Sequence, residues 1–441
     1  RRFWRFPNLR CSTRFGRSLH AKSARRSSVR LVLPKAVPPV EEGDVIQSHG
    51  AAYLKKHGRH LSATQKKALR DLALCRTAAL GGHVERCLDC GAKRVAYNSC
   101  RNRHCPKCQA LSRARWLERE SGYLLPVEYH HVVFTLPQEL GELAAAHAAL
   151  LYHLVMQSAA ETLREVAANP KRLGAHIGVL MVLHTWGQNL HHHPHVHCVV
   201  TGGGLSCNVR GEVDASPRWV SCRPGFFLPV RVLSRVFRGK FLAGLRGLQA
   251  QGKLTLPELG PLYAKDWVVY AKPPFGGSEQ VLKYLARYTH RVAISNHRLV
   301  AMTLSPLAGE GRGEGTVTFR YRDYAKDRKE KLLTLSAEEF LRRFVRHVLP
   351  KGFMKIRHYG LLASRQREAR LRQARKLLLA PMTHPCVAGV GVSPPRSPRW
   401  PVCPAARVFL ARGEFVPRLP LSPFACPSRK PPEPKPHLDT S

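Results

Sequence analysis

Apolar and polar positions alternate along the chain with two periods, one typical of amphipathic helices and one typical of half-buried strands. Segments of the two kinds are interleaved, which predicts a fold of mixed helices and strands. A Gly-Gly-Gly run at residues 202–204 is expected to interrupt this order, because glycine weakens regular structure. Helices are expected over residues 63–75, 140–168, 337–348 and a basic segment ending near 379, and strands over 129–136, 267–270, 299–304 and 316–324.

Histidines are concentrated around one predicted strand: six of the 23 fall between His184 and His197. The sequence His195-Val-His197 leads into an apolar Cys-Val-Val run that predicts a strand, in which both histidines lie on one face and Val196 on the other. Two imidazoles side by side on a strand suit one divalent metal. The apolar run that ends at His184 predicts a neighbouring strand, which the connection 187–194 can fold back to bring His184 beside the pair.

An exposed and inert histidine-rich loop between two strands is the alternative interpretation. This alternative is preferred for the run His191–His193. It is weaker for His195 and His197, because a buried polar side chain on a strand face needs a partner.

Cysteines are also clustered: six of the 13 lie between residues 75 and 108. The spacing Cys87-x-x-Cys90 followed by Cys105-x-x-Cys108 is typical of a tetrahedral four-thiolate zinc site, so these four cysteines are predicted to bind a structural Zn²⁺. Two interpretations stay open for the other candidate ligands of this region: a second zinc site, or side chains that simply lie near the first. These ligands are Cys75, Cys100, His83 and His104.

The charge of the chain predicts a polyanionic partner. The 72 Lys and Arg residues exceed the 29 Asp and Glu residues and give a formal net charge of +43, for which nucleic acid is the expected partner. Basic residues of the cysteine-rich region, Arg101 and Arg103 among them, are expected to contact phosphate. No apolar run reaches the roughly 18 residues of a transmembrane helix, and no P-loop motif occurs, so neither a membrane nor a nucleotide cofactor is expected.

A second candidate site lies in the helix-like segment 279–291. Tyr284 and Tyr288 are four residues apart and therefore share one helical face. Lys283, Arg287 and Arg291 form a basic stripe beside them, which is expected to bind DNA. Two aromatic residues at helical spacing are more commonly part of a core. The flanking cations and the predicted metal site favour a functional role instead.

Composition divides the chain into four segments. Residues 1–45 are expected to be a disordered basic leader, since the first 40 contain no acidic residue and no sustained apolar segment. Residues 46–112 are expected to form a zinc-binding, DNA-binding domain, and residues 113–380 a larger domain that holds the histidines and tyrosines. Residues 381–441 contain 15 of the 33 prolines and are expected to be a disordered Pro/Arg-rich tail.

Three motifs together carry a resemblance to a known family. His-Pro-His-Val-His at 193–197, Tyr-Leu-Ala-Arg-Tyr at 284–288 and the cysteine-rich segment 99–108 resemble the rolling-circle transposases of the insertion-sequence-91 family, which belong to the HUH endonucleases. The resemblance covers about residues 45–378, with the motifs in the family's order. It implies an α+β fold in which an antiparallel sheet flanked by helices, the ferredoxin-like palm of HUH nucleases, follows a small zinc-binding module.

The resemblance also implies roles for single residues. His195 and His197 correspond to metal ligands, with His184 as the third ligand and Gln188 as the alternative. Tyr284 and Tyr288 correspond to the two nucleophiles. The implied catalytic cofactor is Mg²⁺ or Mn²⁺, beside the structural Zn²⁺.

The implied activity is nicking of single-stranded DNA at transposon ends and target. Tyrosine attack would form a 5′-phosphotyrosine, and the strand would then be transferred in rolling-circle transposition. A cytoplasmic, nucleoid-associated bacterial protein is expected. Two alternatives remain: a plasmid replication initiator or relaxase with the same chemistry, and a non-enzymatic, zinc-dependent DNA-binding remnant of a transposase.

Overall fold

The structure of the chain is a computed structural model, and it describes the greater part of residues 40–379. The described residues are 40–87, 91, 93–272, 280, 281, 284, 288–303, 315–323, 329–379, 408, 409, 415 and 416. For residues 86, 87, 111, 408, 409, 415 and 416 it describes the backbone alone. The predicted leader up to residue 39, and Lys283 and Arg287 of the basic stripe, lie outside the described residues.

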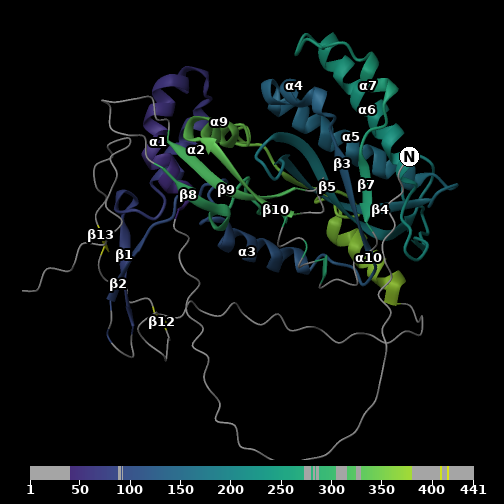
Figure 1. The fold of residues 1–441 in the computed structure, drawn as a ribbon. Helices are drawn as coiled ribbons and strands as arrows, with labels where there is room; N and C mark the ends of the chain where they lie inside the picture. Colours follow the sequence, from purple (N-terminus) through teal and green to yellow (C-terminus); the bar gives the residue numbers. More distant parts are fainter. Residues whose placement is uncertain are drawn as a thin grey trace, which may run out of the picture. The chain divides into compact units, whose positions relative to one another are not determined.

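A six-stranded antiparallel sheet holds the two predicted histidine strands (Figure 1). Its strands pair in the order β11, β4, β5, β3 and β7, and β6 pairs with β5. The strand predicted over 129–136 is confirmed, as are the two strands that carry the histidines, whereas the strand predicted over 267–270 lies two residues later. The six strands are β3 (Tyr129–Thr135), β4 (Ala175–Trp186), β5 (His192–Ser206), β6 (Trp219–Ser221), β7 (Val269–Lys272) and β11 (Ile356–Gly360).

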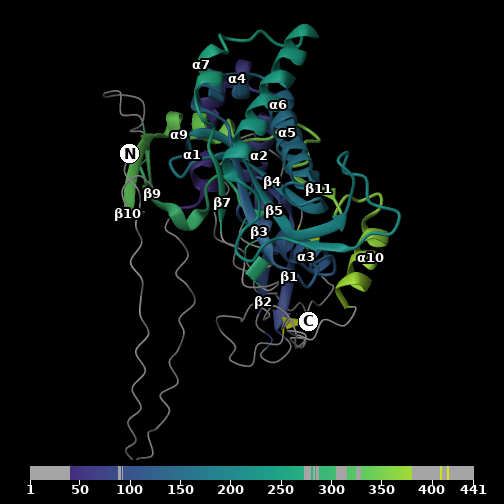
Figure 2. The same cartoon turned by 90° about the vertical axis from the view of Figure 1, so that its right-hand side faces the viewer.

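Two long helices, α5 (Ala148–Ala168) and α6 (Val230–Ala250), lie side by side and cover one face of this sheet (Figure 1, Figure 2). Alternate strand residues, Val196 among them, are fully buried against these helices. The single helix expected over 140–168 is two helices, because His147 has the non-helical dihedral angles φ −115° and ψ 44°. The shorter of the two is α4 (Gly141–Ala146).

The opposite face of the sheet is covered by α3 (Gln109–Ser121) and α10 (Arg367–Leu379). Trp116 of α3 and Leu371 of α10 share a core with Val182 and Val199 of the central strands. The strand residues on this face therefore alternate with those that face α5 and α6. An α+β fold with an antiparallel sheet flanked by helices is confirmed.

A second sheet packs with the N-terminal helices into a core of its own. Strands β8 (Leu299–Met302), β9 (Thr316–Asp323) and β10 (Lys329–Ser336) form an antiparallel meander. Helices α1 (Glu42–His57), α2 (Ala63–Ala73) and α9 (Ala337–Val345) cover it. The core contains Leu69, Cys105 and Phe319, so the region predicted as a separate zinc-binding domain shares a hydrophobic core with residues beyond 290. Helix α1 begins at Glu42, which places the predicted leader boundary at residue 45 inside a helix.

A hairpin of β1 (Gly82–Cys87) and β2 (Lys93–Tyr97) forms a third sheet. Two short strands, β12 (Val408–Phe409) and β13 (Phe415–Val416), pair with β1. These four residues are all that the structure describes of the predicted C-terminal tail; its other residues lie outside the described part.

Several short helical elements connect the larger ones. They are η1 (Gly58–His60), η2 (Ala78–Leu80), η3 (Gln138–Leu140), α7 (Gly260–Ala264) and η4 (Asn296–Arg298). None of the helices in the described residues is both long enough and apolar enough to cross a lipid bilayer.

The glycine run at 202–204 does not interrupt the order of elements as expected, because β5 continues through it to Ser206. A Cβ atom at Gly202 would lie 2.7 Å from the carbonyl oxygen of Glu128, and one at Gly204 would lie 2.3 Å from that of His176. Glycine is needed there because neighbouring backbones approach the strand closely, and not because the chain turns.

A glycine at the end of β11 gives a test of how tightly the edge strand packs on β4. Gly360 has φ +62°, and a Cβ atom there would lie 1.8 Å from the carbonyl oxygen of Ile177. We expect Gly360→Ala to lower the free energy of unfolding by about 2–5 kcal/mol, from the left-handed backbone and the overlap together. Gly352→Ala is the matched control, since Gly352 has φ +73° but open space around it. It should cost only about 1–2 kcal/mol. Equal midpoints of urea unfolding for the two variants would contradict the close packing.

Candidate active site and metal centre

The register between β4 and β5 brings the three predicted histidines together. His184 lies opposite His195, and Val182 lies opposite His197, on the sheet face that is covered by α3 and α10. One ring nitrogen from each histidine lies within 4.8 Å of the other two. The imidazole ring centroids of His184 and His197 are 4.5 Å apart, and those of His195 and His197 are 4.9 Å apart. Val196 is fully buried on the opposite face, as the strand pattern predicts.

Burial keeps these imidazoles in the neutral form that binds metals. Burial lowers the pKa of His195 to about 4 and the pKa values of His184 and His197 well below their usual range. Neighbouring imidazoles and the Arg291 guanidinium act in the same direction. A neutral imidazole keeps a lone pair, which a metal ion can accept.

Hydrogen bonds also orient two of the three rings for a metal. His184 Nε2 donates to the carbonyl oxygen of Tyr288 at 2.9 Å, and His195 Nδ1 donates to that of His193 at 2.7 Å. Each bond fixes the tautomer and leaves the other ring nitrogen of that histidine as the acceptor, as is usual for histidines that bind metals. The three histidines therefore offer a set of nitrogen ligands that fits a divalent ion.

Both predicted tyrosines lie against this histidine group. Tyr284 and Tyr288 have helical backbone and stack with ring centroids 4.3 Å apart. The Tyr284 hydroxyl lies 3.1 Å from His197 Nδ1, and the Tyr288 ring centroid lies 5.0 Å from that of His197. Burial raises the pKa of Tyr284, so its phenol stays protonated at neutral pH. The predicted face of two tyrosines thus meets the predicted histidine strand.

Gln188 was the alternative to His184 as third ligand. It lies in the turn between β4 and β5, where its backbone carbonyl accepts a hydrogen bond from Arg298. The described group of potential ligands contains His184.

The run His191–His193 is only partly the exposed loop that the alternative interpretation favoured. His191 is exposed, whereas His192 and His193 are half-buried. The His192 Nε2 atom lies 2.6 Å from the Tyr152 hydroxyl, so this histidine connects the turn to α5.

The sequence pattern missed two residues of this site. His131 on β3 is 2% exposed, and its Nε2 atom lies 2.5 Å from the Tyr284 hydroxyl. Lys355 donates through Nζ to the carbonyl oxygen of Arg291 at 3.3 Å, and burial, with a contribution from Arg103, lowers the pKa of Lys355 to about 8. Both come from segments far from the histidine motif, and neither belongs to a spacing that identifies a site.

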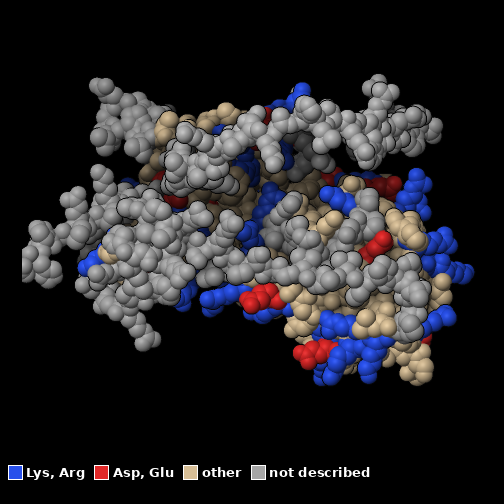
Figure 3. All heavy atoms as spheres, turned by 90° about the horizontal axis from the view of Figure 1, so that it is seen from below, with Lys and Arg blue, Asp and Glu red and all other residues tan. Residues whose placement is uncertain are grey.

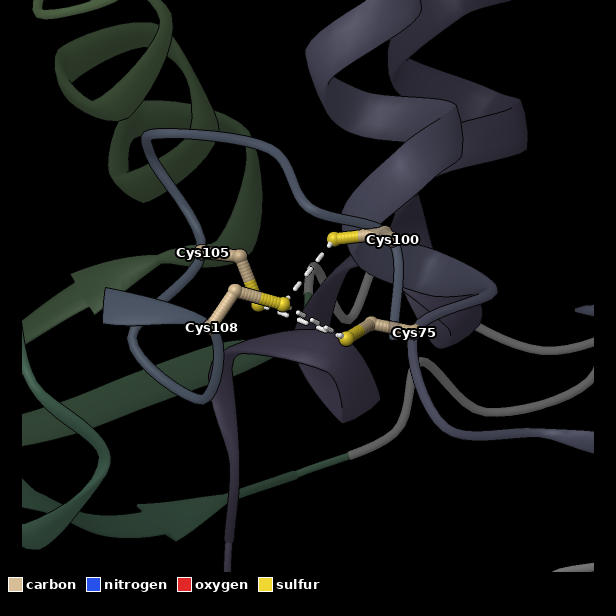
Figure 4. A group of neighbouring side chains, drawn as sticks. All are labelled: Cys75, Cys100, Cys105 and Cys108. Carbon is tan, nitrogen blue, oxygen red and sulfur yellow. Dashed lines mark hydrogen bonds between the residues drawn. The ribbon is translucent and has the colours of Figure 1, made fainter. Parts of the chain in front are cut away.

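Four cysteines converge between α2, β2 and α3 (Figure 4). Cys75 follows α2, Cys100 follows β2, and Cys105 and Cys108 form the turn before α3. Their sulfur atoms all lie within 4.8 Å of one another, and the Cys75–Cys108, Cys75–Cys105 and Cys100–Cys108 separations are 3.5, 3.5 and 3.6 Å. Sulfur atoms around tetrahedral zinc are separated by about 3.8 Å, since each Zn–S bond is about 2.3 Å. The four thiols therefore fit a zinc ion.

Hydrogen bonds within the cluster shift the pKa values of the four thiols in opposite directions. Those from Cys100 and Cys105 lower the pKa of Cys75 to about 7, and neighbouring thiols lower the pKa of Cys108 but raise the pKa values of Cys100 and Cys105. Deprotonated sulfur is the form that binds zinc.

In the structure, the neighbours of Cys105 and Cys108 are Cys75 and Cys100. The spacing in the sequence had instead predicted Cys87 and Cys90 as their partners. Cys87 ends β1 at the tip of the hairpin, five residues along the strand from Gly82. The side chain of Cys87 and all of Cys90 lie outside the described residues, so their predicted role is not tested. Of the other candidate ligands in this region, Cys75 and Cys100 lie within the cluster.

Two arginines of the cysteine-rich loop differ in their surroundings. Arg101 is exposed. Arg103 is half-buried and donates to the carbonyl oxygens of Phe353 at 2.5 Å and Pro350 at 3.3 Å. Arg103 therefore ties the cysteine cluster to the segment that leads to Lys355.

A basic surface adjoins the tyrosines. On the described part of the face seen in Figure 3, Lys and Arg side chains are more abundant than Asp and Glu side chains. The Trp116 ring of α3 lies 5.7 Å from that of His290, and burial and the charges of Lys355, Arg113 and Arg119 lower the pKa of His290 to about 4. The exposed basic residues of the two helices on this side are Arg113, Arg115, Arg119, Arg372 and Lys376.

Comparison with known proteins finds matches to two family models and to two relatives. Residues 178–370 match a family model described as "Putative transposase", and residues 45–136 match one described as "Transposase zinc-binding domain". The chain is 51% identical over 352 residues to "Putative transposase y4qJ" of Sinorhizobium fredii, an alignment that covers 77% of this chain and 84% of the relative.

A second relative is more distant. The "Transposase for insertion sequence element IS801" of Pseudomonas savastanoi pv. phaseolicola is 29% identical over 322 residues, which cover 71% of this chain and 74% of that protein. No solved structure matches the chain, so the ferredoxin-like palm stays an expectation from the resemblance. The chain belongs to the insertion-sequence-91 (IS91) family of transposases with an N-terminal zinc-binding domain, and it is a DNA-processing enzyme.

Proposed function

We propose that the chain nicks single-stranded DNA by tyrosine attack and transfers the strand in rolling-circle transposition. One observation carries the proposal: the hydroxyl of Tyr284 lies within hydrogen-bonding distance of His197. His197 belongs to the group of three neutral histidines that could hold a metal ion. A nucleophile and a candidate metal site are thereby adjacent. The ring of Tyr288, stacked on Tyr284, supplies a second candidate nucleophile at the same place.

The proposed chemistry conserves the energy of the phosphodiester. The phenol oxygen of a tyrosine forms a bond to phosphorus, the bond from phosphorus to the 3′ oxygen breaks, and the electron pair leaves with that oxygen. The phenol loses its proton and the 3′ oxygen gains one, which leaves a 5′-phosphotyrosine and a 3′-hydroxyl. No nucleotide cofactor is consumed, because the new ester can be attacked by another 3′-hydroxyl.

His184, His195 and His197 would hold a catalytic Mg²⁺ or Mn²⁺. When bound, such an ion polarises the non-bridging oxygens of the scissile phosphate. Imidazole ligands accept zinc equally well, so the choice of Mg²⁺ or Mn²⁺ rests on the reaction class. Since all three ligands are neutral, they leave the charge of the ion undiminished beside the phosphate.

Two tyrosines allow two strand ends to be handled at once. While one tyrosine holds the first 5′ end, the other can cleave a second strand. The stacking of the two rings lets a small helix movement exchange them at the phosphate. Strand transfer requires such an arrangement, and single nicking does not.

Basic side chains beside the site would hold the DNA backbone. Arg291 lies with its guanidinium carbon 5.9 Å from the Tyr288 ring centroid, and the α3 arginines lie beside the following turn. We also propose that Lys283, Arg287 and Arg101 contact DNA, as their places in the sequence predict. With DNA at transposon ends and target as substrate, the proposed place of action is the bacterial nucleoid in the cytoplasm.

We further propose that Cys75, Cys100, Cys105 and Cys108 hold the structural zinc of the N-terminal module. This module extends over about residues 46–112 and the catalytic region over 113–380, but their shared core means that each supports the other. Metal-bound cysteines would fix the turn before α3 and, through Arg103, the segment 350–353.

The two alternatives from the sequence are less well supported. A plasmid initiator or relaxase would use the same chemistry, but both curated relatives are named as transposases. A non-enzymatic remnant would have no need for a tyrosine hydroxyl beside clustered histidines. Nicking by the purified chain separates the remnant from the enzyme.

We expect substitutions at the histidine site to slow DNA cleavage without weakening DNA binding. His197→Ala should slow formation of the covalent protein–DNA adduct in Mn²⁺ by about 100-fold or more, since charge stabilisation by a metal is worth several kcal/mol. Affinity for a single-stranded oligonucleotide should change by less than about threefold, because dispersed Lys and Arg contacts supply it. His191→Ala, an exposed histidine of the same region, is the matched control and should leave both unchanged. A parallel loss of affinity and cleavage in His197→Ala would show that the histidine serves the fold.

The tyrosines predict a redundancy in adduct formation. Tyr284→Phe and Tyr288→Phe each keep the ring but remove the attacking oxygen, so each single variant should still form adduct and neither should transpose. The double variant should form no adduct on a denaturing gel. Tyr321→Phe in β9 is the control and should behave as the unaltered chain. An adduct that persists in the double variant places the nucleophile elsewhere, with Tyr321 and Tyr324 the next candidates.

The cysteine cluster predicts a single zinc ion whose ligands can be told apart by substitution. The full chain should contain zinc, and Cys75→Ser or Cys108→Ser should remove it and lower Tm by about 10–20 °C, as expected for a loss near 5 kcal/mol. Cys222→Ala, outside the cluster, is the control. Loss of zinc on Cys87→Ser but not on Cys75→Ser, measured by metal analysis, would restore the pairing of the two knuckles predicted from their spacing.

A further inference from the structure

Strand β3 brings a fourth histidine to the site. His131 faces the same side of the sheet as the metal-site histidines, since it pairs with Val199 of β5 and is the diagonal neighbour of His197. The rings of His131 and His197 are stacked, with centroids 5.2 Å apart and planes inclined by 7°. His131 is 2% exposed, so it has little freedom to leave this position.

His131, His197 and Tyr284 form one hydrogen-bonded group. His131 Nε2 lies 2.5 Å from the Tyr284 hydroxyl and 3.0 Å from His197 Nδ1, and the hydroxyl lies 3.1 Å from His197 Nδ1. One assignment of protons gives the hydroxyl both a donor and an acceptor: the Tyr284 O–H donates to His131 Nε2, and His197 Nδ1–H donates to the Tyr284 oxygen. With this assignment of protons, His197 Nε2 keeps its lone pair and would be the atom that binds a metal ion.

The two tyrosines differ in this respect. Tyr288 contacts the site through its ring, stacked on Tyr284 and close to the rings of His184 and His197. Within the described residues, no hydrogen bond is found for its hydroxyl. No described hydrogen bond holds the Tyr288 hydroxyl in place when its ring moves, whereas hydrogen bonds with two imidazoles hold the Tyr284 oxygen.

We propose that His131 is a positioning residue that fixes the Tyr284 hydroxyl beside the metal-site histidines, so that attack by Tyr284, but not by Tyr288, depends on His131. The inference rests on the proposed tyrosine nicking. It makes the two nucleophiles unequal through a residue outside both of their motifs. His131 acts through Tyr284 and is not itself assigned a contact with DNA.

Single-tyrosine proteins test this dependence. In the Tyr288→Phe protein, where Tyr284 alone can react, His131→Leu should slow adduct formation with an oligonucleotide in Mn²⁺ at least about tenfold, since a tenfold effect equals only about 1.4 kcal/mol of lost orientation. In the Tyr284→Phe protein the same change should have less than about a twofold effect. His131→Gln, whose side-chain oxygen can accept the phenol hydrogen, should restore most of the rate in the Tyr288→Phe protein. Equal losses in both proteins, or no loss in either, would overturn the proposal.

Thermal unfolding tests the hydrogen bond without relying on activity. Tyr284→Phe should lower Tm more when His131 is present than in the His131→Leu protein, because both changes remove the His131–Tyr284 hydrogen bond, whereas the bond to His197 is lost with the hydroxyl in either protein. Tyr288→Phe should shift Tm equally in both. If neither single-tyrosine parent forms adduct, the proposed nicking is contradicted, and this cycle still decides whether His131 holds Tyr284. Additive shifts of Tm for His131→Leu and Tyr284→Phe would overturn the positioning role.

Discussion

The antiparallel register of β4 with β5 is the constraint on which the site depends. It sets His184 opposite His195 and places His197 one pair further along the same face. A shift of the register by one residue would turn the histidines of β5 toward α5 and α6 and bring Val196 to the site. The apolar residues that alternate with these histidines along β4 and β5 are buried in the core on the opposite face, so a shift of the register would be costly. The geometry of the site is therefore stabilised by the hydrophobic core on the other side of the sheet.

The cysteine cluster and the histidine site are connected through ordinary packing and hydrogen bonds. Cys75 and Cys105 belong to the same hydrophobic core as β8, β9 and α9, and Arg103 reaches the backbone of residues 350–353. A few residues further on, Lys355 donates to the carbonyl of Arg291, three residues beyond Tyr288. Loss of zinc is thus expected to disturb the tyrosine segment as well as the loop that binds it.

Local patterns predicted the parts of the site whose geometry is local. The two-residue period of His195-Val-His197 identified the shared face, and the apolar run before His184 identified its partner strand. Spacing did not identify partners that come from distant segments: Cys75 and Cys100 join Cys105 and Cys108 because α2 and β2 end at the same place. His131 could not be found at all, since its role depends on the order of strands in the sheet. The glycine run at 202–204 likewise reflects neighbouring backbones that no local pattern records.

Electron paramagnetic resonance of Mn²⁺ bound to the full chain tests the central claim most directly, because nitrogen couplings count the imidazoles on the ion. We expect one strongly bound Mn²⁺ with couplings to three histidine nitrogens, reduced to two in His184→Asn and unchanged in His191→Ala. A bound Mn²⁺ without nitrogen couplings, or with couplings that His184→Asn leaves unaltered, would contradict the metal site that the register of β4 and β5 creates.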